Sequence, residues 1–94
     1  MVTRGEVVGG VFALTGEITT VGRHGASDVF LDDVTVSRRH AEIRRTLNEY
    51  AVFDLASLNG TYLNEVRVET AVLRDGDLLQ IGKFKLMFLE ASAP

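Results

Sequence analysis

Short apolar runs alternate with polar positions along this chain, and turn residues separate the runs. Residues 40–44 alternate apolar and polar side chains, and Phe84, Leu86 and Phe88 recur at every second position near the end of the chain. A two-residue period is typical of a strand with one buried face. A helical period is hard to find anywhere. The pattern therefore predicts a protein built from strands.

The predicted strands are short, and most of them end near a glycine, an aspartate, or an Asn-Gly or Asp-Gly pair, which are strong turn signals. They cover residues 11–14, 17–21, 29–31, 40–44, 50–53, 61–63, 66–68, 71–73, 78–81 and 83–89. Together with the end of a clipped first strand at residues 1–4, this gives about ten to eleven short, mainly antiparallel strands, as in a sandwich or barrel. We predict an all-β sandwich with its binding loops at one end.

The length of 94 residues allows one domain and is too short for two. We expect residues 1–90 to form this domain, with the native chain beginning before its clipped first strand, and residues 91–94 to form a frayed tail. The chain has no cysteine, which excludes disulfides and thiolate metal sites. No apolar run is long enough to span a bilayer and no signal peptide is visible, so a cytoplasmic domain is expected.

The charge pattern favours a small anion over a polyanion as the ligand. The net charge is −3, from 10 basic and 13 acidic residues. This argues against duplex nucleic acid, whose affinity for proteins comes mainly from neutralised phosphates. Two arginine pairs, Arg38-Arg39 and Arg44-Arg45, nevertheless lie close together in the sequence. A local cationic patch on an acidic domain suits one small anion.

Three segments at predicted strand ends carry the candidate binding chemistry. They are residues 22–24 (Gly-Arg-His), 37–40 (Ser-Arg-Arg-His) and 57–61 (Ser-Leu-Asn-Gly-Thr). An arginine offers planar paired donors that match phosphate oxygens, and a serine hydroxyl adds a neutral donor. An asparagine amide can both donate to and accept from a peptide backbone. A scaffold that brings these segments together could bind a phosphorylated peptide.

Taken singly, each of these residues also has an ordinary structural interpretation. Arg23 could be a solvated arginine in a turn, and Ser37 could bond its own backbone. Arg38 and Arg39 could face the acidic pair at residues 32–33, and His40 could be a core or loop-bracing histidine. Asn59-Gly60 could be only a tight turn. The binding interpretation depends on all three segments occurring in this order.

The chain as a whole resembles the forkhead-associated (FHA) domain family. The family pattern is a Gly-Arg pair, then Ser-x-x-His, then an Asn-Gly pair before a short strand, and all three motifs are present in the segments above. The later family signature also appears, as Leu73, Gly76-Asp77 and Ile81-Gly82. The resemblance implies an FHA-type β-sandwich that binds a phosphothreonine-containing protein segment in Ser/Thr kinase signalling.

Residues 27–42 and 57–62 are similar to the small actinobacterial FHA regulators of the GarA type. Those proteins lie downstream of Ser/Thr kinases and control 2-oxoglutarate and glutamate metabolism. The resemblance therefore implies two kinds of partner. One is a phosphothreonine segment of a Ser/Thr kinase or of a kinase substrate, and the other is an enzyme of 2-oxoglutarate or glutamate metabolism.

Carried over by position, the resemblance assigns a role to each candidate residue. The phosphate would be held by Arg23, Ser37 and Arg38, and the backbone of the bound peptide by Asn59 and Asn64. Secondary or selectivity contacts are expected from Thr35, Arg39, Ser57 and Leu58, and loop bracing from Gly22, His40 and Gly60. Many relatives place a threonine before the Asn-Gly pair, where this chain has Leu58. A backbone amide or Ser57 would then contact the phosphate, or the phosphate would have one contact fewer.

Two alternatives stay open from the sequence. An enzyme would need more than Ser37 and His40, because there is no G-x-S-x-G elbow, no evident third member, no Walker loop and no carboxylate cluster beyond residues 32–33. We therefore expect no catalysis, no metal and no cofactor. The second alternative is a phospho-independent interaction domain that uses the same loop surface.

Overall fold

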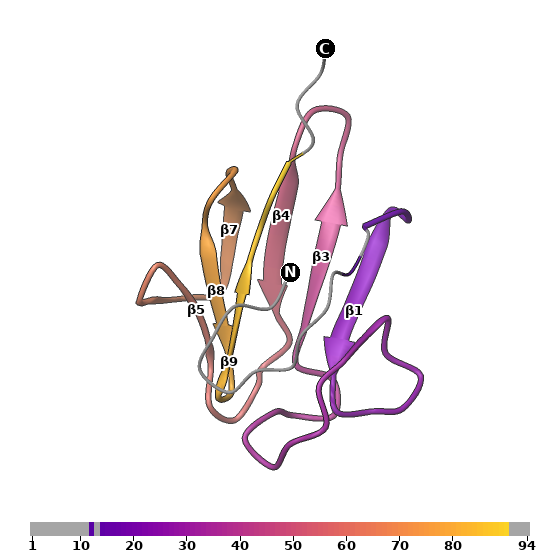
Figure 1. Ribbon diagram of the computed structural model, residues 1–94, viewed down its shortest axis with the longest axis vertical. Coiled ribbons are helices and arrows are strands. Elements are labelled where there is room, and N and C mark those ends of the chain that lie inside the picture. Colours follow the sequence, from indigo (N-terminus) through magenta and orange to yellow (C-terminus); the bar gives the residue numbers. More distant parts are fainter. Residues whose placement is uncertain (1–11, 13, 91–94) are drawn as a thin grey trace.

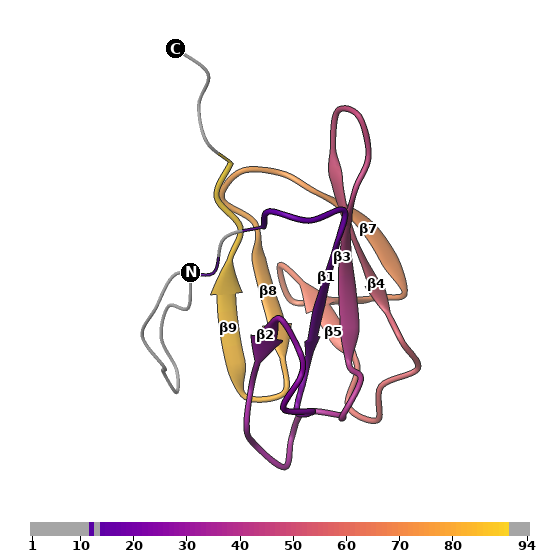
Figure 2. The same cartoon turned by 90° about the vertical axis from the view of Figure 1, so that its right-hand side faces the viewer.

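The described part of the chain consists of two β-sheets. The computed structural model describes residue 12 and residues 14–90, and within this range it contains nine strands and no helix. It follows that no helix of the described chain is long and apolar enough to cross a membrane. The first sheet has the order β2-β1-β3-β4-β7, and the second has the order β6-β5-β8-β9. Figures 1 and 2 show the strands of the two sheets lying over one another in separate layers.

The strand bounds follow the apolar runs of the sequence. The five-stranded sheet contains β1 (Ile18–Gly22), β2 (Val29–Phe30), β3 (Ala41–Arg45), β4 (Tyr50–Asp54) and β7 (Thr70–Leu73). The four-stranded sheet contains β5 (Thr61–Leu63), β6 (Val66–Val68), β8 (Leu78–Ile81) and β9 (Phe84–Met87). All pairings are antiparallel except that of β1 with the two-residue strand β2. The all-β, mainly antiparallel sandwich predicted from the sequence is confirmed.

The core lies between the two sheets and is formed by alternate strand residues. On β3, Ala41 and Ile43 are buried while Arg44 is exposed, and on β8, Leu79 and Ile81 are buried. This is the two-residue period expected when each sheet buries one face. The buried apolar residues are Val21, Val29, Leu31, Val36, Ala41, Ile43, Val52, Leu73, Leu79, Ile81, Phe84, Leu86 and Phe88.

Each strand predicted from residue 17 onward has a counterpart in the structure, whereas the structure describes only residues 12 and 14 of the predicted strand at residues 11–14. Phe12 and Leu14 pack against the core without belonging to a strand. Residues 11 and 13 lie outside the described residues, as do the predicted remnant of a first strand at residues 1–4 and the predicted tail at residues 91–94. The predicted domain bounds therefore stay a prediction.

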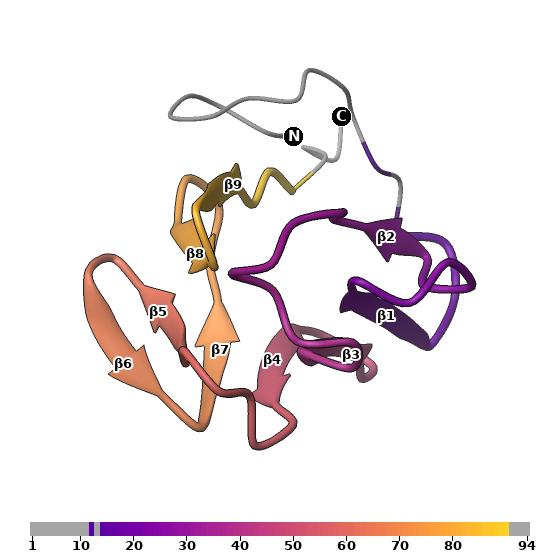
Figure 3. The ribbon, with the colours of Figure 1, turned by 90° about the horizontal axis from the view of Figure 1, so that it is seen from below.

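The connections that carry the candidate residues gather at one end of the sandwich. β1 and β4 end there, and β3 begins there, at the bottom of Figure 1. Figure 3 shows this end face on, with the connections between β2 and β3 and between β4 and β5 in front. We call residues 22–28, 31–40 and 55–60, together with the β8–β9 turn at Gly82 and Lys83, the loop end.

Candidate functional site

Gly22 lets the first loop of the loop end lie against the second. A side-chain carbon at Gly22 would collide with the carbonyl group of Arg38 and would lie 3.2 Å from the His40 nitrogen. With no side chain in the way, the Arg23 amide donates to the Ser37 carbonyl at 3.0 Å and the His24 amide donates to the Arg38 carbonyl at 3.2 Å. The Gly-Arg motif therefore lies directly beside the Ser-Arg-Arg-His motif.

One nitrogen of the Arg23 guanidinium is bonded to the protein, and the other two are available to a ligand. Its Nε donates to the Val36 carbonyl at 3.0 Å. The two η nitrogens have no protein partner within the described residues, and the side chain is exposed. An η pair in a fixed plane is the donor geometry that a phosphate accepts in a bidentate manner.

His40 joins the second loop to the third from inside the protein. The residue is 0% exposed. Its Nδ1 lies 3.0 Å from the Ser37 amide, and its Nε2 lies 2.9 Å from the Gly60 carbonyl oxygen. An amide donates to Nδ1, so Nε2 must carry the proton that is donated to Gly60, and the ring is the neutral Nε2–H tautomer. No ring nitrogen is left for a metal, and no group of three or more His, Asp or Glu residues in the described range is placed to hold one.

Two further hydrogen bonds connect the second and third loops at the surface. The Leu58 amide donates to the Ser37 hydroxyl oxygen at 3.0 Å, which leaves the hydroxyl hydrogen available to a ligand. The Asn59 side-chain nitrogen donates to the Thr35 carbonyl at 3.0 Å, which leaves the amide oxygen and one hydrogen available. The two loops therefore form one surface with unused donors and acceptors.

The third loop takes its shape from Asp54, at the end of β4. The Asp54 carboxylate accepts the Ser57 hydroxyl at 2.5 Å, the Ser57 amide at 3.1 Å and the Thr61 hydroxyl at 2.7 Å. Burial alone raises the pKa of Asp54, but these hydrogen bonds outweigh burial and leave the pKa lowered. Ser57 is 7% exposed, and its oxygen also accepts the Gly60 amide at 3.0 Å. Its hydroxyl group is therefore committed to the loop.

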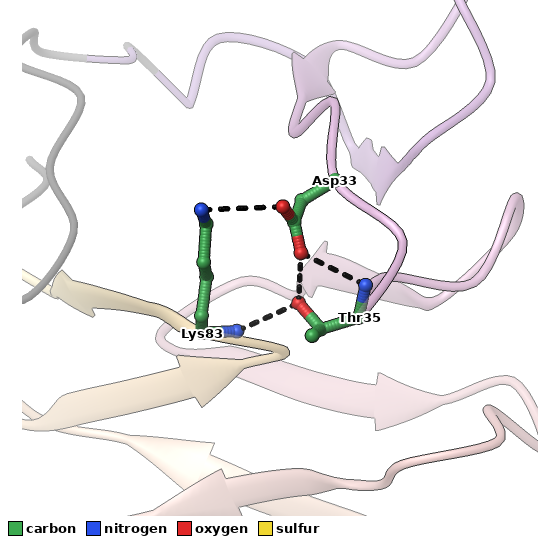
Figure 4. Close-up of polar contacts among 3 residues, drawn as sticks. All are labelled: Asp33, Thr35 and Lys83. Atoms are coloured by element: carbon green, nitrogen blue, oxygen red, sulfur yellow. Dashed lines mark hydrogen bonds and ion pairs between the residues drawn. The ribbon is translucent and has the colours of Figure 1, made fainter.

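Figure 4 shows how the second loop is attached to the β8–β9 turn. The Thr35 hydroxyl donates to the Asp33 carboxylate at 2.6 Å and accepts the Lys83 amide at 3.0 Å, while the Lys83 amine lies 3.2 Å from the same carboxylate. The Thr35 hydroxyl and amide, helped by Lys83, lower the pKa of Asp33 to about 2. A side-chain carbon at Gly82, where φ is +60°, would collide with Thr35. Thr35 therefore packs tightly on this turn.

Asn64, predicted from the sequence as a second contact to the peptide backbone, uses part of its side-chain amide within the protein. Asn64 lies in the β5–β6 turn with φ at 50°, and its side chain donates to Asp77 and accepts from the Leu78 amide, both at 3.0 Å. Arg38 and Arg39 are exposed on the second loop, where they make no side-chain hydrogen bond or ion pair within the described residues. The Leu58 side chain is 84% exposed.

Several residues that shape the site were not found from the sequence. Asp54 carries the third loop, and Asp33 and Lys83 anchor the second. The Asp-x-x-Ser spacing from Asp54 to Ser57 was a usable signal, since aspartate commonly bonds the backbone of a following turn. The contact of Lys83 with Asp33 had no sequence signal, because it joins residues far apart in the chain.

An open groove runs from the loop end onto the four-stranded sheet. It has a volume of about 680 Å³ and is lined by Thr35, Asn59, Gly60, Tyr62, Glu65, Gln80, Gly82 and Lys83. Five of these residues belong to the loop end, and Tyr62 and Gln80 come from β5 and β8. A ligand held at the loops can therefore continue along the sheet.

The comparisons with known proteins agree with this geometry. The sequence model of the FHA domain family matches residues 19–82. The chain belongs to the FHA domain family. It is 58% identical over 89 residues to the glycogen accumulation regulator GarA of Mycobacterium tuberculosis, a match that covers 95% of this chain and 55% of GarA. It is 55% identical over 92 residues to the oxoglutarate dehydrogenase inhibitor of Corynebacterium jeikeium, covering 98% of this chain and 64% of the inhibitor.

This FHA chain thus spans little more than half the length of GarA and less than two thirds of the inhibitor. Among solved structures it is similar to Mycobacterium tuberculosis EmbR in complex with a low-affinity phosphopeptide. The TM-score is 0.84 at 32% identity, and the match covers 88% of this chain and 22% of EmbR. The FHA resemblance noted in the sequence is therefore confirmed in both sequence and structure.

Proposed function

We propose that this FHA domain binds a phosphothreonine-containing protein segment at its loop end. Arg23, Ser37 and Arg38 hold the phosphate, and Asn59 bonds the backbone of the segment. The observation that carries the proposal is the set of unused donors on one braced surface, namely the Arg23 η nitrogens and the Ser37 hydroxyl hydrogen. Hydrogen bonds to a charged group contribute roughly 1.5 to 3 kcal/mol each, so a few such contacts suffice for a specific complex.

The other secondary contacts named from the sequence enter the proposal in different ways. Arg39 and Leu58 are exposed beside the phosphate residues and are available to a ligand. Ser57 and Thr35 act through the loops, since their hydroxyl groups bond Asp54 and Asp33. The phosphate contact that many relatives make with a threonine is therefore either missing or supplied by the backbone in this chain.

The wider role follows from the relatives rather than from the site. The two relatives are called a glycogen accumulation regulator and an oxoglutarate dehydrogenase inhibitor, and both names describe regulation. We propose that this chain is likewise a non-catalytic regulatory module. In this role it acts in the cytoplasm downstream of a Ser/Thr kinase and binds an enzyme of 2-oxoglutarate or glutamate metabolism.

The test uses one peptide sequence in three forms. Calorimetry compares the phosphothreonine peptide with its phosphoserine and unphosphorylated versions. We expect no measurable binding of the unphosphorylated peptide. We expect at least several-fold weaker binding of the phosphoserine peptide, because one buried methyl group is worth on the order of 0.8 kcal/mol. Equal binding of all three peptides would overturn the proposal.

A second candidate function is supported by a separate observation. The Asn59 amide oxygen and the exposed Leu58 side chain offer contacts that need no phosphate. They favour a partner that docks on the same surface while unphosphorylated. Such a partner would keep binding after enzymatic dephosphorylation, which separates this candidate from the first.

A further inference from the structure

A row of four side chains crosses the outer face of the four-stranded sheet. Cross-strand pairing sets Tyr62 opposite Arg67 on β6, Tyr62 opposite Gln80 on β8, and Gln80 opposite Lys85 on β9. Residues directly opposite one another in a sheet point to the same face. Tyr62 and Gln80 line the groove that starts at the loop end, so Arg67 and Lys85 border it on either side.

Arg67 lies directly on the third loop. A side-chain carbon added at Gly60 would meet the Arg67 Nε at 2.7 Å, its Cζ at 3.0 Å and its Cδ at 3.3 Å. Gly60 immediately follows Asn59 and is held by His40. The Arg67 guanidinium is therefore next to the residue proposed to bond the peptide backbone.

The charges around the groove leave Arg67 uncompensated. The lining residues include one base, Lys83, whose amine is already paired with Asp33 at 3.2 Å. They also include one acid, Glu65, which makes no ion pair or hydrogen bond within the described residues and is not paired with Arg67. The Arg67 side chain likewise has no hydrogen bond or ion pair in the described range, and Lys85 adds a second positive charge to the row. The two positive charges of Arg67 and Lys85 therefore exceed the single negative charge of Glu65.

We propose that Arg67 binds a carboxylate side chain of the bound segment. The domain then selects phosphothreonine segments that carry an aspartate or glutamate near the phosphothreonine. A guanidinium suits this task because its planar donors match a carboxylate as well as a phosphate. The inference rests on the proposed function, since the segment must first be held at the loop end.

A phosphothreonine peptide array tests the inference. Aspartate, glutamine and lysine are placed in turn at every position flanking the phosphothreonine, and each array is repeated without phosphate. For the wild-type protein we expect aspartate to strengthen binding at one position by about three- to tenfold over glutamine, as for a well-formed ion pair at a partly exposed site. Arg67→Gln should abolish this preference, and Arg67→Glu should reverse it toward lysine.

Arg45→Gln is the matched control, because it removes one exposed arginine charge from β3, whose other end adjoins the loop end. It should leave the aspartate preference unchanged. Arg67→Lys keeps the charge and should retain part of the preference, which also covers the case in which Arg67→Gln fails to fold. The inference about Arg67 is wrong if the wild-type protein has no preference for acidic residues, or if that preference survives in Arg67→Gln. Either result would leave the proposed function standing. Binding that does not need phosphate would instead overturn the proposed function.

Discussion

The polar residues of the site divide their hydrogen-bonding capacity between the fold and the ligand. Arg23 uses Nε for the Val36 carbonyl and keeps its η nitrogens, Ser37 accepts with its oxygen and keeps its hydrogen, and Asn59 donates to Thr35 and keeps its oxygen. Each side chain is therefore fixed before a ligand arrives. Fixing it in advance reduces the entropy lost on binding.

Replacing Arg23 tests the phosphate contact. Arg23→Ala should weaken phosphothreonine peptide binding at least about tenfold, because losing a charge-assisted hydrogen bond costs more than the 1.4 kcal/mol that corresponds to a factor of ten. Arg23→Lys should recover only part of the loss, since a lysine cannot bond Val36 and the phosphate in one plane. Calorimetry measures both variants, and circular dichroism should show an unchanged fold. Wild-type affinity in Arg23→Ala would refute this role.

Ser37 and Asn59 should differ in which partners they affect. Ser37→Ala removes a phosphate donor and should weaken phosphopeptide binding much more than binding of an unphosphorylated partner. Asn59→Ala removes a backbone contact and the bond to the Thr35 carbonyl, so it should also weaken an unphosphorylated partner. Both variants are titrated against one phosphopeptide and one unphosphorylated partner. The assigned roles are wrong if the two variants lose the unphosphorylated partner to the same extent.

The sequence identified the residues of the site better than it identified their bonds. The Gly-Arg, Ser-x-x-His and Asn-Gly motifs pointed to side chains that the fold does gather. The spacing of Asp54 and Ser57 was a signal for their hydrogen bond, but the sequence could not show that Asn64 bonds Asp77. A polar residue in a loop can bond the chain or a ligand, and only the positions of its neighbours decide between the two.

At the scale of elements, the strand pattern was predictable from residue 17 onward because each strand buries one face. Phe12 and Leu14 show the limit of this reasoning. These two residues alternate and contact the core, as a strand would, but they do not belong to one. Alternation reports which side chains are buried, whereas a strand also requires a neighbouring strand to accept its backbone hydrogen bonds.

The attachment of the second loop to the β8–β9 turn should depend on pH. The pKa of Asp33 is lowered from 3.8 to about 2 in the folded protein, so the folded state binds a proton less readily than the unfolded state. Its contribution to stability is therefore complete above about pH 4 and is lost as the pH falls toward 2. Asp33→Asn should make the fall in Tm across this range shallower than in the wild-type protein.

Thermal unfolding at several pH values measures this effect. Asp32→Asn is the matched control, because it removes the same charge from the exposed neighbouring residue, which makes no hydrogen bond or ion pair within the described range. The lowered pKa of Asp54 acts in the same direction in all three proteins and cancels in the comparison. Identical pH profiles for wild type and Asp33→Asn would show that this carboxylate does not stabilise the fold.

At the scale of the whole molecule, the loop end is attached to both sheets. Asp54 holds the third loop where the chain passes from β4 to β5, and Thr35 holds the second loop to the turn between β8 and β9. His40 connects these two loops from the interior. The sandwich therefore presents one rigid surface rather than three separate loops.

Hydrogen exchange in the free protein tests this rigidity. Among the backbone amides of the loop end that donate to side chains, three serve as probes: Ser37 donates to His40, Leu58 to Ser37 and Gly60 to Ser57. We expect slowed exchange at all three without any ligand, even though Leu58 itself is exposed. Ser37→Ala should speed exchange at Leu58 by about two- to tenfold, as expected for one hydrogen bond of about 0.5 to 1.5 kcal/mol.

The set of amides that exchange faster in Ser37→Ala distinguishes the loss of one hydrogen bond from a general loosening of the fold. In Ser37→Ala, exchange at the Lys83 amide should stay as in the wild type, because its acceptor is the Thr35 hydroxyl. Two-dimensional NMR spectra recorded after transfer to heavy water give the rate at each amide. Leu58 exchanging at the rate of an unstructured peptide in the wild type would mean that the loops become ordered only on binding. Binding of the segment would then cost more entropy than binding to loops that are already ordered in the free protein.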